Sequence, residues 1–249
     1  MSSSTTLPLD PRDLDTNNNS NSDSYYNIHN TTNLKIQGPS FAIATHNVRG
    51  LNSVTKQSQL LAHMLDNDIS IMGISETKLK SQATPLIFKG NTDVTAWWCC
   101  NDTSPSSTGV GLVLHHSIAQ YVQSVKSYKG RVIHVDLYLR GNTKLRIIQV
   151  YIQAHITDKV ARYDIDKYIQ QMIDQAQDKH FKVIVMGDFN SDPDVLENLL
   201  DNGSKVHWRY RLITNLKHRG FLDSFRCFHE VGGSTWSDKH SSKARIDQI

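Results

Sequence analysis

The chain has 249 residues, 38% of them hydrophobic, which is enough to bury the core of one large domain. Its 27 basic and 24 acidic residues give a formal net charge of +3, too small to indicate a polyanion partner by itself. The three cysteines support neither a disulfide framework nor a zinc site, and they favour a reducing intracellular compartment. No apolar run reaches the roughly 18 residues of a membrane span, and no secretory signal pattern opens the chain.

Residues 1–38 are dominated by Ser, Thr, Asn and Asp and show neither a helical nor a strand period. A segment of this composition cannot bury enough apolar surface to offset the cost of ordering it. We therefore predict that residues 1–38 are disordered and that residues 39–249 form one domain.

The predicted domain begins with a strand, a helix and a second strand. A β-type run covers residues 41–48, and apolar residues at helical spacing predict a helix from about Thr55. The next strand is expected over residues 69–76 and ends in the acid Glu76. Both strands therefore deliver polar side chains to their ends.

The middle of the chain is a run of further strands, expected over residues 94–99, 109–115, 121–125, 131–139 and 144–152. The last two are separated by a turn with Gly and Asn, which predicts an antiparallel hairpin. A helix is then expected over residues 158–179, with Thr157 as its N-cap.

A buried strand leads into the most informative stretch of the sequence. Four apolar residues, 183–186, run into Gly187, and Asp188 and Asn190 follow two positions apart. This spacing places both side chains on the same side of an extended backbone. A helix over residues 208–218 and a last strand over 244–249 complete the pattern. Strand runs interleaved with helices favour two packed sheets with helices outside, an α+β layered arrangement.

Polar side chains collect at the ends of these strands. They are three carboxylates, two amides and a phenol: Glu76, Asp188, Asp247, Asn47, Asn190 and Tyr151. Hard oxygen ligands without cysteine or paired histidine favour Mg²⁺ or Mn²⁺ over zinc. A carboxylate can hold a metal ion or a water, and an amide can donate to a phosphate oxygen. The set therefore predicts a metal and phosphate site.

Six blocks carry a resemblance to a known family: Thr45–Leu51, Ile74–Thr77, Gln149–Tyr151, Gly187–Asn190, Ser234–Trp236 and Arg245–Asp247. In this order they resemble the blocks of the endonuclease/exonuclease/phosphatase superfamily, and most of all the apurinic-type endonuclease domain of non-LTR (LINE-like) retrotransposons. The resemblance implies a DNase I-like fold, an α/β four-layer sandwich of two packed mixed β-sheets flanked by helices. It also implies Mg²⁺-dependent cleavage of DNA, and hence a nuclear location.

The resemblance also implies roles for individual residues. Glu76 is similar to the family's metal ligand, and Asn47 to the residue beside it on the metal or the phosphate. Asp188 is similar to the acid that positions or deprotonates the attacking water, Asn190 to the amide on a phosphate oxygen, and Tyr151 to the phenol near the scissile phosphate.

Three further positions complete the comparison. Thr235 is similar to a phosphate-side contact, and Asp247 to the acid that orients a catalytic histidine. Arg49, expected to bind phosphate or DNA, stands where many repair-type members carry an acid. The family's closing Ser-Asp-His block would follow Asp247, and the sequence stops at Ile249. The resemblance thus implies a domain without its last strand and an activity impaired by the missing histidine.

Other functions remain open at this stage. The same fold can act on inositol phosphates, sphingomyelin or poly(A), and the chain can be an inactive remnant that only binds nucleic acid. A basic region fits a solvated helix face as well as a contact with DNA. It comprises Lys205, Arg209, Arg211, Lys217, His218 and Arg219.

Overall fold

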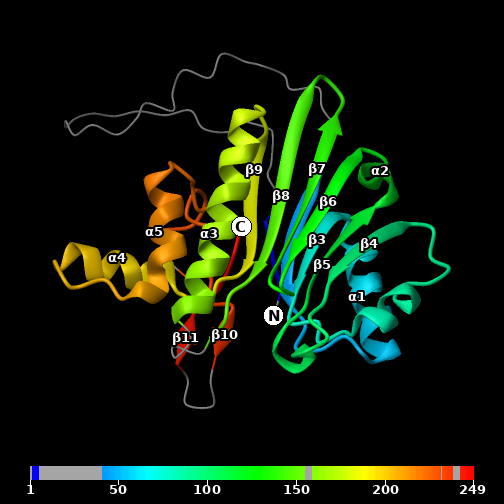
Figure 1. Cartoon of the computed structure of the whole chain (residues 1–249), viewed down its shortest axis with the longest axis horizontal. Coiled ribbons are helices and arrows are strands. Elements are labelled where there is room, and N and C mark those ends of the chain that lie inside the picture. Colours follow the sequence, from blue (N-terminus) through cyan, green and yellow to red (C-terminus); the bar gives the residue numbers. More distant parts are fainter. Residues whose placement is uncertain (1, 6–40, 155–158, 231, 238–241) are drawn as a thin grey trace, which may run out of the picture.

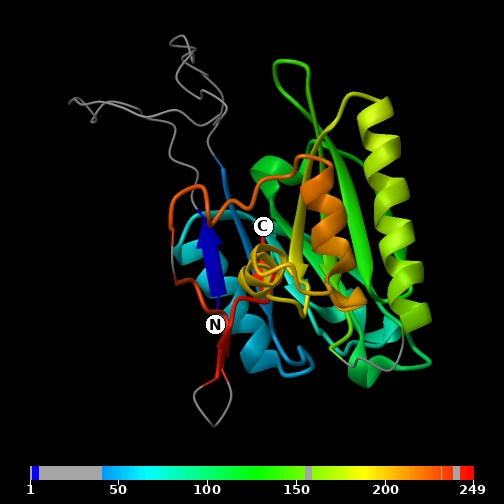
Figure 2. The same ribbon diagram turned by 90° about the vertical axis from the view of Figure 1, so that its left-hand side faces the viewer.

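Two five-stranded mixed sheets pack face to face at the centre of the molecule, and helices cover their outer faces (Figures 1 and 2). The structure, a computed structural model, describes residues 2–5, 41–154, 159–230, 232–237 and 242–249. The strand order is β1-β2-β3-β5-β4 in the first sheet and β12-β9-β8-β7-β6 in the second. This arrangement confirms the predicted α/β sandwich.

The first sheet contains the strands from the first part of the domain. They are β2 (Ala42–Asn47), β3 (Ile69–Ser75), β4 (Val94–Cys99) and β5 (Val110–His115), with β1 (Ser2–Thr5) at the edge. Strands β2 and β3 are parallel and are joined by helix α1 (Val54–Asp66), which buries Leu60 and Met64. The short helices η1 (Ser81–Leu86), η2 (Pro105–Ser107) and α2 (His116–Ala119) lie in the connections.

The second sheet contains β6 (Val122–Tyr128), β7 (Val132–Leu139), β8 (Thr143–Tyr151), β9 (Lys182–Asp188) and β12 (Asp247–Gln248). Strands β7 and β8 form the predicted antiparallel hairpin. Strands β8 and β9 are parallel and are joined by helix α3 (Lys159–Asp178). No helix in the described ranges is both long and apolar enough to span a membrane.

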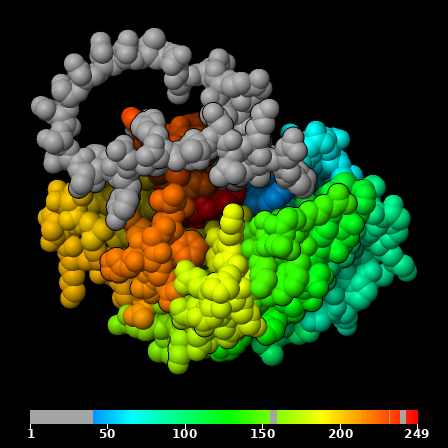
Figure 3. Space-filling model, turned by 90° about the horizontal axis from the view of Figure 1, so that it is seen from above, coloured from blue at the N-terminus to red at the C-terminus, as the bar shows by residue number. Residues whose placement is uncertain are grey.

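The C-terminal third contains elements that the sequence pattern did not predict. Helix α4 (Pro193–Asp201) follows β9, and the predicted helix over 208–218 is a short η3 (Trp208–Tyr210) continued by α5 (Arg211–His218). Seen from above, α4 and α5 lie at the opposite end of the molecule from the cyan region around α1 (Figure 3). The predicted strand over 244–249 is divided between β11 (Lys243–Ala244), which pairs with β10 (Trp236–Ser237), and β12.

The structure also differs from the predicted disordered segment at its start. Ser2–Thr5 forms β1, which pairs antiparallel with β2, because the edge of β2 offers unpaired backbone groups to any extended chain. The rest of that segment, residues 6–38, and the predicted cap Thr157 lie outside the described residues.

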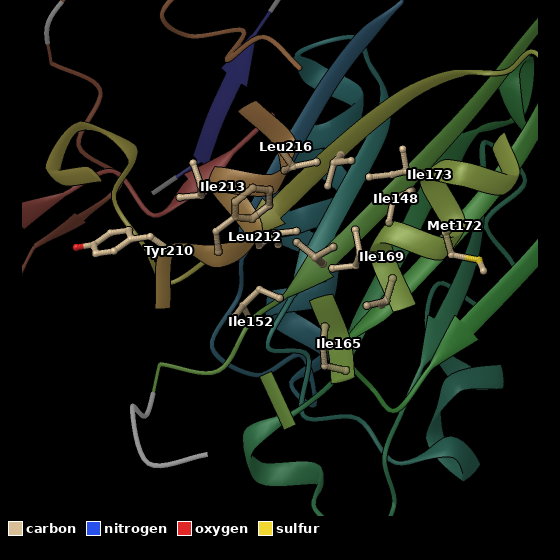
Figure 4. Close-up of a cluster of buried hydrophobic side chains, with 14 of the residues drawn as sticks. Ile148, Ile152, Ile165, Ile169, Met172, Ile173, Tyr210, Leu212, Ile213 and Leu216 are labelled. Carbon is tan, nitrogen blue, oxygen red and sulfur yellow. The ribbon is translucent and has the colours of Figure 1, made fainter. Parts of the chain in front are cut away.

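Three apolar clusters fill the layers. One lies between the two sheets, one between the first sheet and α1, and one between the second sheet and helices α3 and α5 (Figure 4). The sheets lie close together at Gly73, where an added Cβ would come within 1.9 Å of the Gln149 side chain. Gln149 is fully buried and donates from Nε2 to Ser75 Oγ at 2.8 Å, so a polar contact joins the two sheets.

Candidate active site

Strands β2, β3, β8 and β9 end at the same edge of the sandwich, and an open cleft of about 800 Å³ lies there. Six of the eight predicted site residues line this cleft: Asn47, Arg49, Glu76, Tyr151, Asp188 and Asn190. The carboxyl ends of parallel strands meet at one edge, which is why residues far apart in the sequence share the cleft.

Asp188 is the most constrained of these side chains. It is 1% exposed, and both of its oxygens are occupied: Oδ2 accepts from Asn47 Nδ2 at 2.7 Å, and Oδ1 accepts from the backbone N–H of Asn190 at 2.9 Å. Gly187 permits this placement, since its φ is +134° and an added Cβ would come within 2.1 Å of the Val150 carbonyl oxygen. The carboxylate therefore has a fixed orientation.

A second buried acid lies directly across from the first. The antiparallel pairing of β12 with β9 places Asp247 opposite Asp188. Burial, with the Asp247 carboxylate as the next cause, raises the pKa of Asp188 to about 7. Burial also raises the pKa of Asp247 to about 6, while the Thr235 hydroxyl opposes this shift. The pair is therefore only partly ionised near neutral pH.

Thr235 and Arg245 lie close to the second acid in the chain or in space, and neither lines the cleft. The hydroxyl oxygen of Thr235 accepts from the backbone N–H groups of Ile246 and Asp247, both at 3.1 Å. Thr235 does not line the cleft, whereas it was expected at the phosphate. Arg245 pairs with Asp223 at 2.6 Å and with Asp194 at 3.1 Å, and not with its neighbour Asp247.

Asn190 lies in the left-handed region, with φ of +46°. Its Nδ2 donates to the Ile152 carbonyl oxygen at 2.7 Å, which uses one of the two amide hydrogens. The other hydrogen has no acceptor among the residues that the structure describes, so it can donate to a ligand in the cleft.

Glu76 and Arg49 also adopt the left-handed backbone, with φ of +57° and +49°. Such conformations are uncommon outside glycine and cluster at functional sites. Glu76 forms an ion pair with Lys78 at 2.8 Å, and Asn47 Oδ1 accepts from the backbone N–H of Arg49 at 3.0 Å. Oxygen atoms of Glu76 and Asn47 thus lie at the cleft with one local partner each.

The oxygen atoms at the cleft can be compared with the ligands that a divalent cation requires. No group of three or more His, Cys, Asp or Glu side chains in the described ranges is arranged to hold a metal. Mg²⁺, however, binds through one or two carboxylates together with water and substrate phosphate, and its ligands are oxygen atoms. Asp247 Oδ1 is buried without a hydrogen-bond partner among the described residues, and two ionisable acids lie side by side. The residues therefore fit a hard cation that binds together with its substrate.

Tyr151 is buried to 8% exposure at the end of β8. The guanidinium of Arg131 lies 4.8 Å from the centre of its ring. Burial, followed by the carboxylate of Glu76, raises the pKa of Tyr151 to about 12. The phenol therefore stays protonated and can donate a hydrogen bond at neutral pH.

Two arginines of the site were missed by the sequence analysis. Arg131 lines the cleft. Arg162 lies behind it and forms hydrogen bonds to three backbone segments around the cleft. Arg162 donates to the carbonyl oxygens of Gln153 at 2.5 Å, Phe189 at 3.0 Å and Arg209 at 2.9 Å. A signal was present, because Arg162 stands on the apolar stripe of the predicted helix, three residues before Ile165, where a charge needs a partner.

A buried acid pair and a fixed amide thus lie at the strand ends of a two-sheet sandwich. The sequence matches the model of the endonuclease/exonuclease/phosphatase family over residues 44–249, and the chain belongs to this family. No curated protein matches the sequence.

Several solved structures share the fold at low sequence identity. A 3′–5′ exonuclease from Neisseria meningitidis is 22% identical, covering 83% of this chain and 84% of that one with a TM-score of 0.62. The catalytic domain of APE2 from Xenopus laevis is 16% identical, with 83% and 80% coverage and a TM-score of 0.62. The AP endonuclease LMAP from Leishmania major is 13% identical, with 84% and 78% coverage and a TM-score of 0.65.

Proposed function

We propose that this chain is a divalent-metal-dependent phosphodiesterase that nicks DNA by attack of a water molecule. The observation that carries this proposal is the fixed Asp188 carboxylate beside Asp247 on the wall of an open cleft. A nuclease-type function is supported by the family and by neighbours of known structure, which include an exonuclease and an AP endonuclease.

Each side chain has a step that its environment suits. The pKa of Asp188, raised to about 7, makes its carboxylate a suitable base for the attacking water near neutral pH. The second amide hydrogen of Asn190 and the protonated phenol of Tyr151 donate to phosphate oxygens. Asp247 would orient a basic group, as the resemblance implies. Mg²⁺ or Mn²⁺ held by Glu76 and Asn47 would supply Lewis-acid stabilisation of the leaving oxygen.

The test is a nicking assay on supercoiled plasmid with Mg²⁺, run beside a chelator control. Nicking should require Mg²⁺, and Asp188→Asn should abolish it. Phosphate release from an inositol phosphate is measured in parallel. Phosphate release without nicking would overturn the proposal that DNA is the substrate. Equal nicking by Asp188→Asn would show that Asp188 takes no part in the reaction.

We also propose a retrotransposon-type rather than a repair-type specificity, and with it a nuclear location. Support comes from the sequence blocks, and in particular from Arg49 at a position where many repair-type members carry an acid. A repair-type enzyme requires an abasic site, so plasmids with and without abasic sites separate the two types. Nicking of the intact plasmid at a comparable rate is expected, and strict dependence on abasic sites would contradict the proposal.

A further inference from the structure

A second cavity, of about 620 Å³, combines positive charge with aromatic rings beside the catalytic cleft. Its lining includes Lys159 and Tyr163 from the start of α3 and Lys205, His207, Trp208 and Arg211 around η3. Helix α3 begins at the end of the molecule where β8 and β9 terminate (Figure 1). The cavity and the cleft therefore open at the same end of the fold.

The basic region of residues 205–219 is divided by the structure. Arg209 turns inward and donates to the Asn190 carbonyl oxygen at 2.9 Å. Lys217 pairs with Glu197 at 2.8 Å, and Arg219 pairs with Asp174 at 2.7 Å. Two cations of this region remain at the cavity, Lys205 and Arg211, and Lys159 from helix α3 is the third cation there. The side chain of Arg211 is half exposed although it pairs with Asp166.

The aromatic rings of the cavity form a connected row. The ring centroid of Trp208 lies 5.0 Å from that of His207 and 6.4 Å from that of Tyr163, with Tyr163 edge-on at 83°. Arg211 and Lys159 lie over the Tyr163 ring, at 4.6 and 5.3 Å from its centroid. Because Arg211 and Lys159 already lie over the ring of Tyr163, the half-buried Trp208 is the larger of the two remaining rings that can stack on a ligand.

Hydrogen bonds connect the cavity to the cleft. The carbonyl oxygen of Arg209, inside η3, accepts from Arg162 at 2.9 Å and from Ser191 Oγ at 3.0 Å. Arg162 also binds the carbonyl oxygen of Gln153, which lines the cleft. Hydrogen bonds through Arg162 thus link the segment that lines the cavity to the segment that lines the cleft.

We propose that this cavity binds unpaired nucleotides of the nucleic acid whose phosphodiester lies in the cleft. Lys159 and Lys205 take backbone phosphates, and one base stacks on Trp208. The single strand is favoured over the duplex because a base reaches an aromatic ring only when it is unstacked from its neighbours. The inference rests on the proposed nucleic acid substrate, but it concerns binding and is tested without cleavage.

The test measures fluorescence anisotropy of a labelled oligothymidylate of about 12 nucleotides and of a duplex of the same length, in chelator and over a range of salt. We expect the double variant Lys159→Gln/Lys205→Gln to bind the single strand roughly 10-fold more weakly, with the log-affinity against log-salt slope smaller by about 1.4. The matched control is Lys182→Gln/Lys217→Gln, which removes two exposed lysines outside the cavity and should bind as the wild type does.

Stacking is tested separately. Trp208→Leu should weaken single-strand binding by about 5-fold or more, whereas Trp208→Phe should retain most of it. Thermal melting checks that each variant is folded. If Trp208→Leu does not fold, the two lysine double variants still test the proposal. Wild-type affinity in the cavity variants, or an equal loss on duplex, would overturn the proposal. A chain that fails to nick plasmid but shows the expected binding losses would overturn the proposed function alone.

Discussion

At the scale of single residues, contacts within the protein fix the orientation of the side chains that line the cleft. Both oxygens of Asp188 are bound, one amide hydrogen of Asn190 is used, and Glu76 is paired with Lys78. Groups fixed in this way need not reorganise when charge develops on a bound phosphate. This arrangement costs stability when both acids are ionised, because Asp188 and Asp247 are buried and lie opposite each other on β9 and β12.

This cost predicts how the stability of the metal-free protein depends on pH. Since burial raises the pKa of Asp247 and Asp188 above the ordinary value of 3.8, the stability that their protonated forms provide is present below about pH 4. It is lost as the pH rises through about 6 to 7. Asp247→Asn should therefore stabilise the metal-free protein by about 2 kcal/mol near pH 8 and change little near pH 4. Melting curves in chelator check this, with exposed Asp201→Asn as the control, and a lower melting temperature near pH 8 would contradict it.

Glu76 carries the second prediction at this scale. Glu76→Gln keeps the size of the side chain and removes its charge, so Mg²⁺ affinity should fall by about 10-fold or more. Calorimetric titration of the folded protein measures the affinity. Glu197→Gln is the matched control, because Glu197 also pairs with a lysine but does not line the cleft. Unchanged affinity in Glu76→Gln would exclude this residue as a ligand.

At the scale of elements, strand β9 determines the site. It pairs parallel with β8 and antiparallel with β12, and these pairings bring Tyr151 and Asp247 level with Asp188. Helix α4 begins immediately after the site, where the Asp192 side chain accepts from the backbone N–H of Asp194 and Pro193 takes the first turn. The same carboxylate accepts from the backbone N–H of Arg245, so the cap also fixes the chain that leads into β12.

Gly187 provides the prediction for β9. Gly187→Ala forces a Cβ to within 2.1 Å of a backbone oxygen at a φ of +134°, so we expect a loss of about 3 kcal/mol or more. Gly141→Ala is the control: Gly141 also has a positive φ, +74°, but no atom lies within 4 Å of its added Cβ, and the cost should be about 1 to 2 kcal/mol. Urea unfolding of both variants measures the difference. Equal midpoints would show that the strands can separate to admit the methyl group.

At the scale of the whole molecule, buried polar side chains join the layers. Gln149 connects the two sheets, and Arg162 connects α3 to the ends of β8 and β9 and to η3. Burial lowers the pKa of Arg162 to about 10, which leaves it charged at neutral pH. Its hydrogen bonds to three carbonyl oxygens and to Ser191 compensate for that burial.

Arg162→Leu should therefore affect distant parts of the fold together. We expect a loss of at least about 3 kcal/mol, because several charge-assisted hydrogen bonds disappear and their carbonyl oxygens stay buried. Single-strand binding should also fall, since η3 loses its connection to the cleft. Thermal melting and anisotropy measure the two effects, with exposed Arg140→Leu as the control. A change of less than about 1 kcal/mol would mean that the layers are held together without Arg162.

The sequence by itself determined the strands and helices that have strong local patterns. Apolar runs predicted β2, β3, β8 and β9, and the polar residues at or near the ends of these runs identified five side chains of the cleft: Asn47, Glu76, Tyr151, Asp188 and Asn190. These features depend on residues close together in the chain, so periodicity and turn residues are sufficient to find them. Helix α4 was missed because Asp192 and Pro193 are typical of turns as well as of helix starts, and because its buried face, with Leu196, is short.

The tertiary structure alone decided how these groups meet. The position of Asp247 opposite Asp188, the contact of Thr235 with backbone rather than with the cleft, and the inward direction of Arg162 and Arg209 all depend on pairings between distant segments. No local pattern encodes such register or orientation, because many residues can satisfy the same hydrophobic alternation. The raised pKa of Asp188 follows from the same cause: burial and a neighbouring charge are properties of the folded environment.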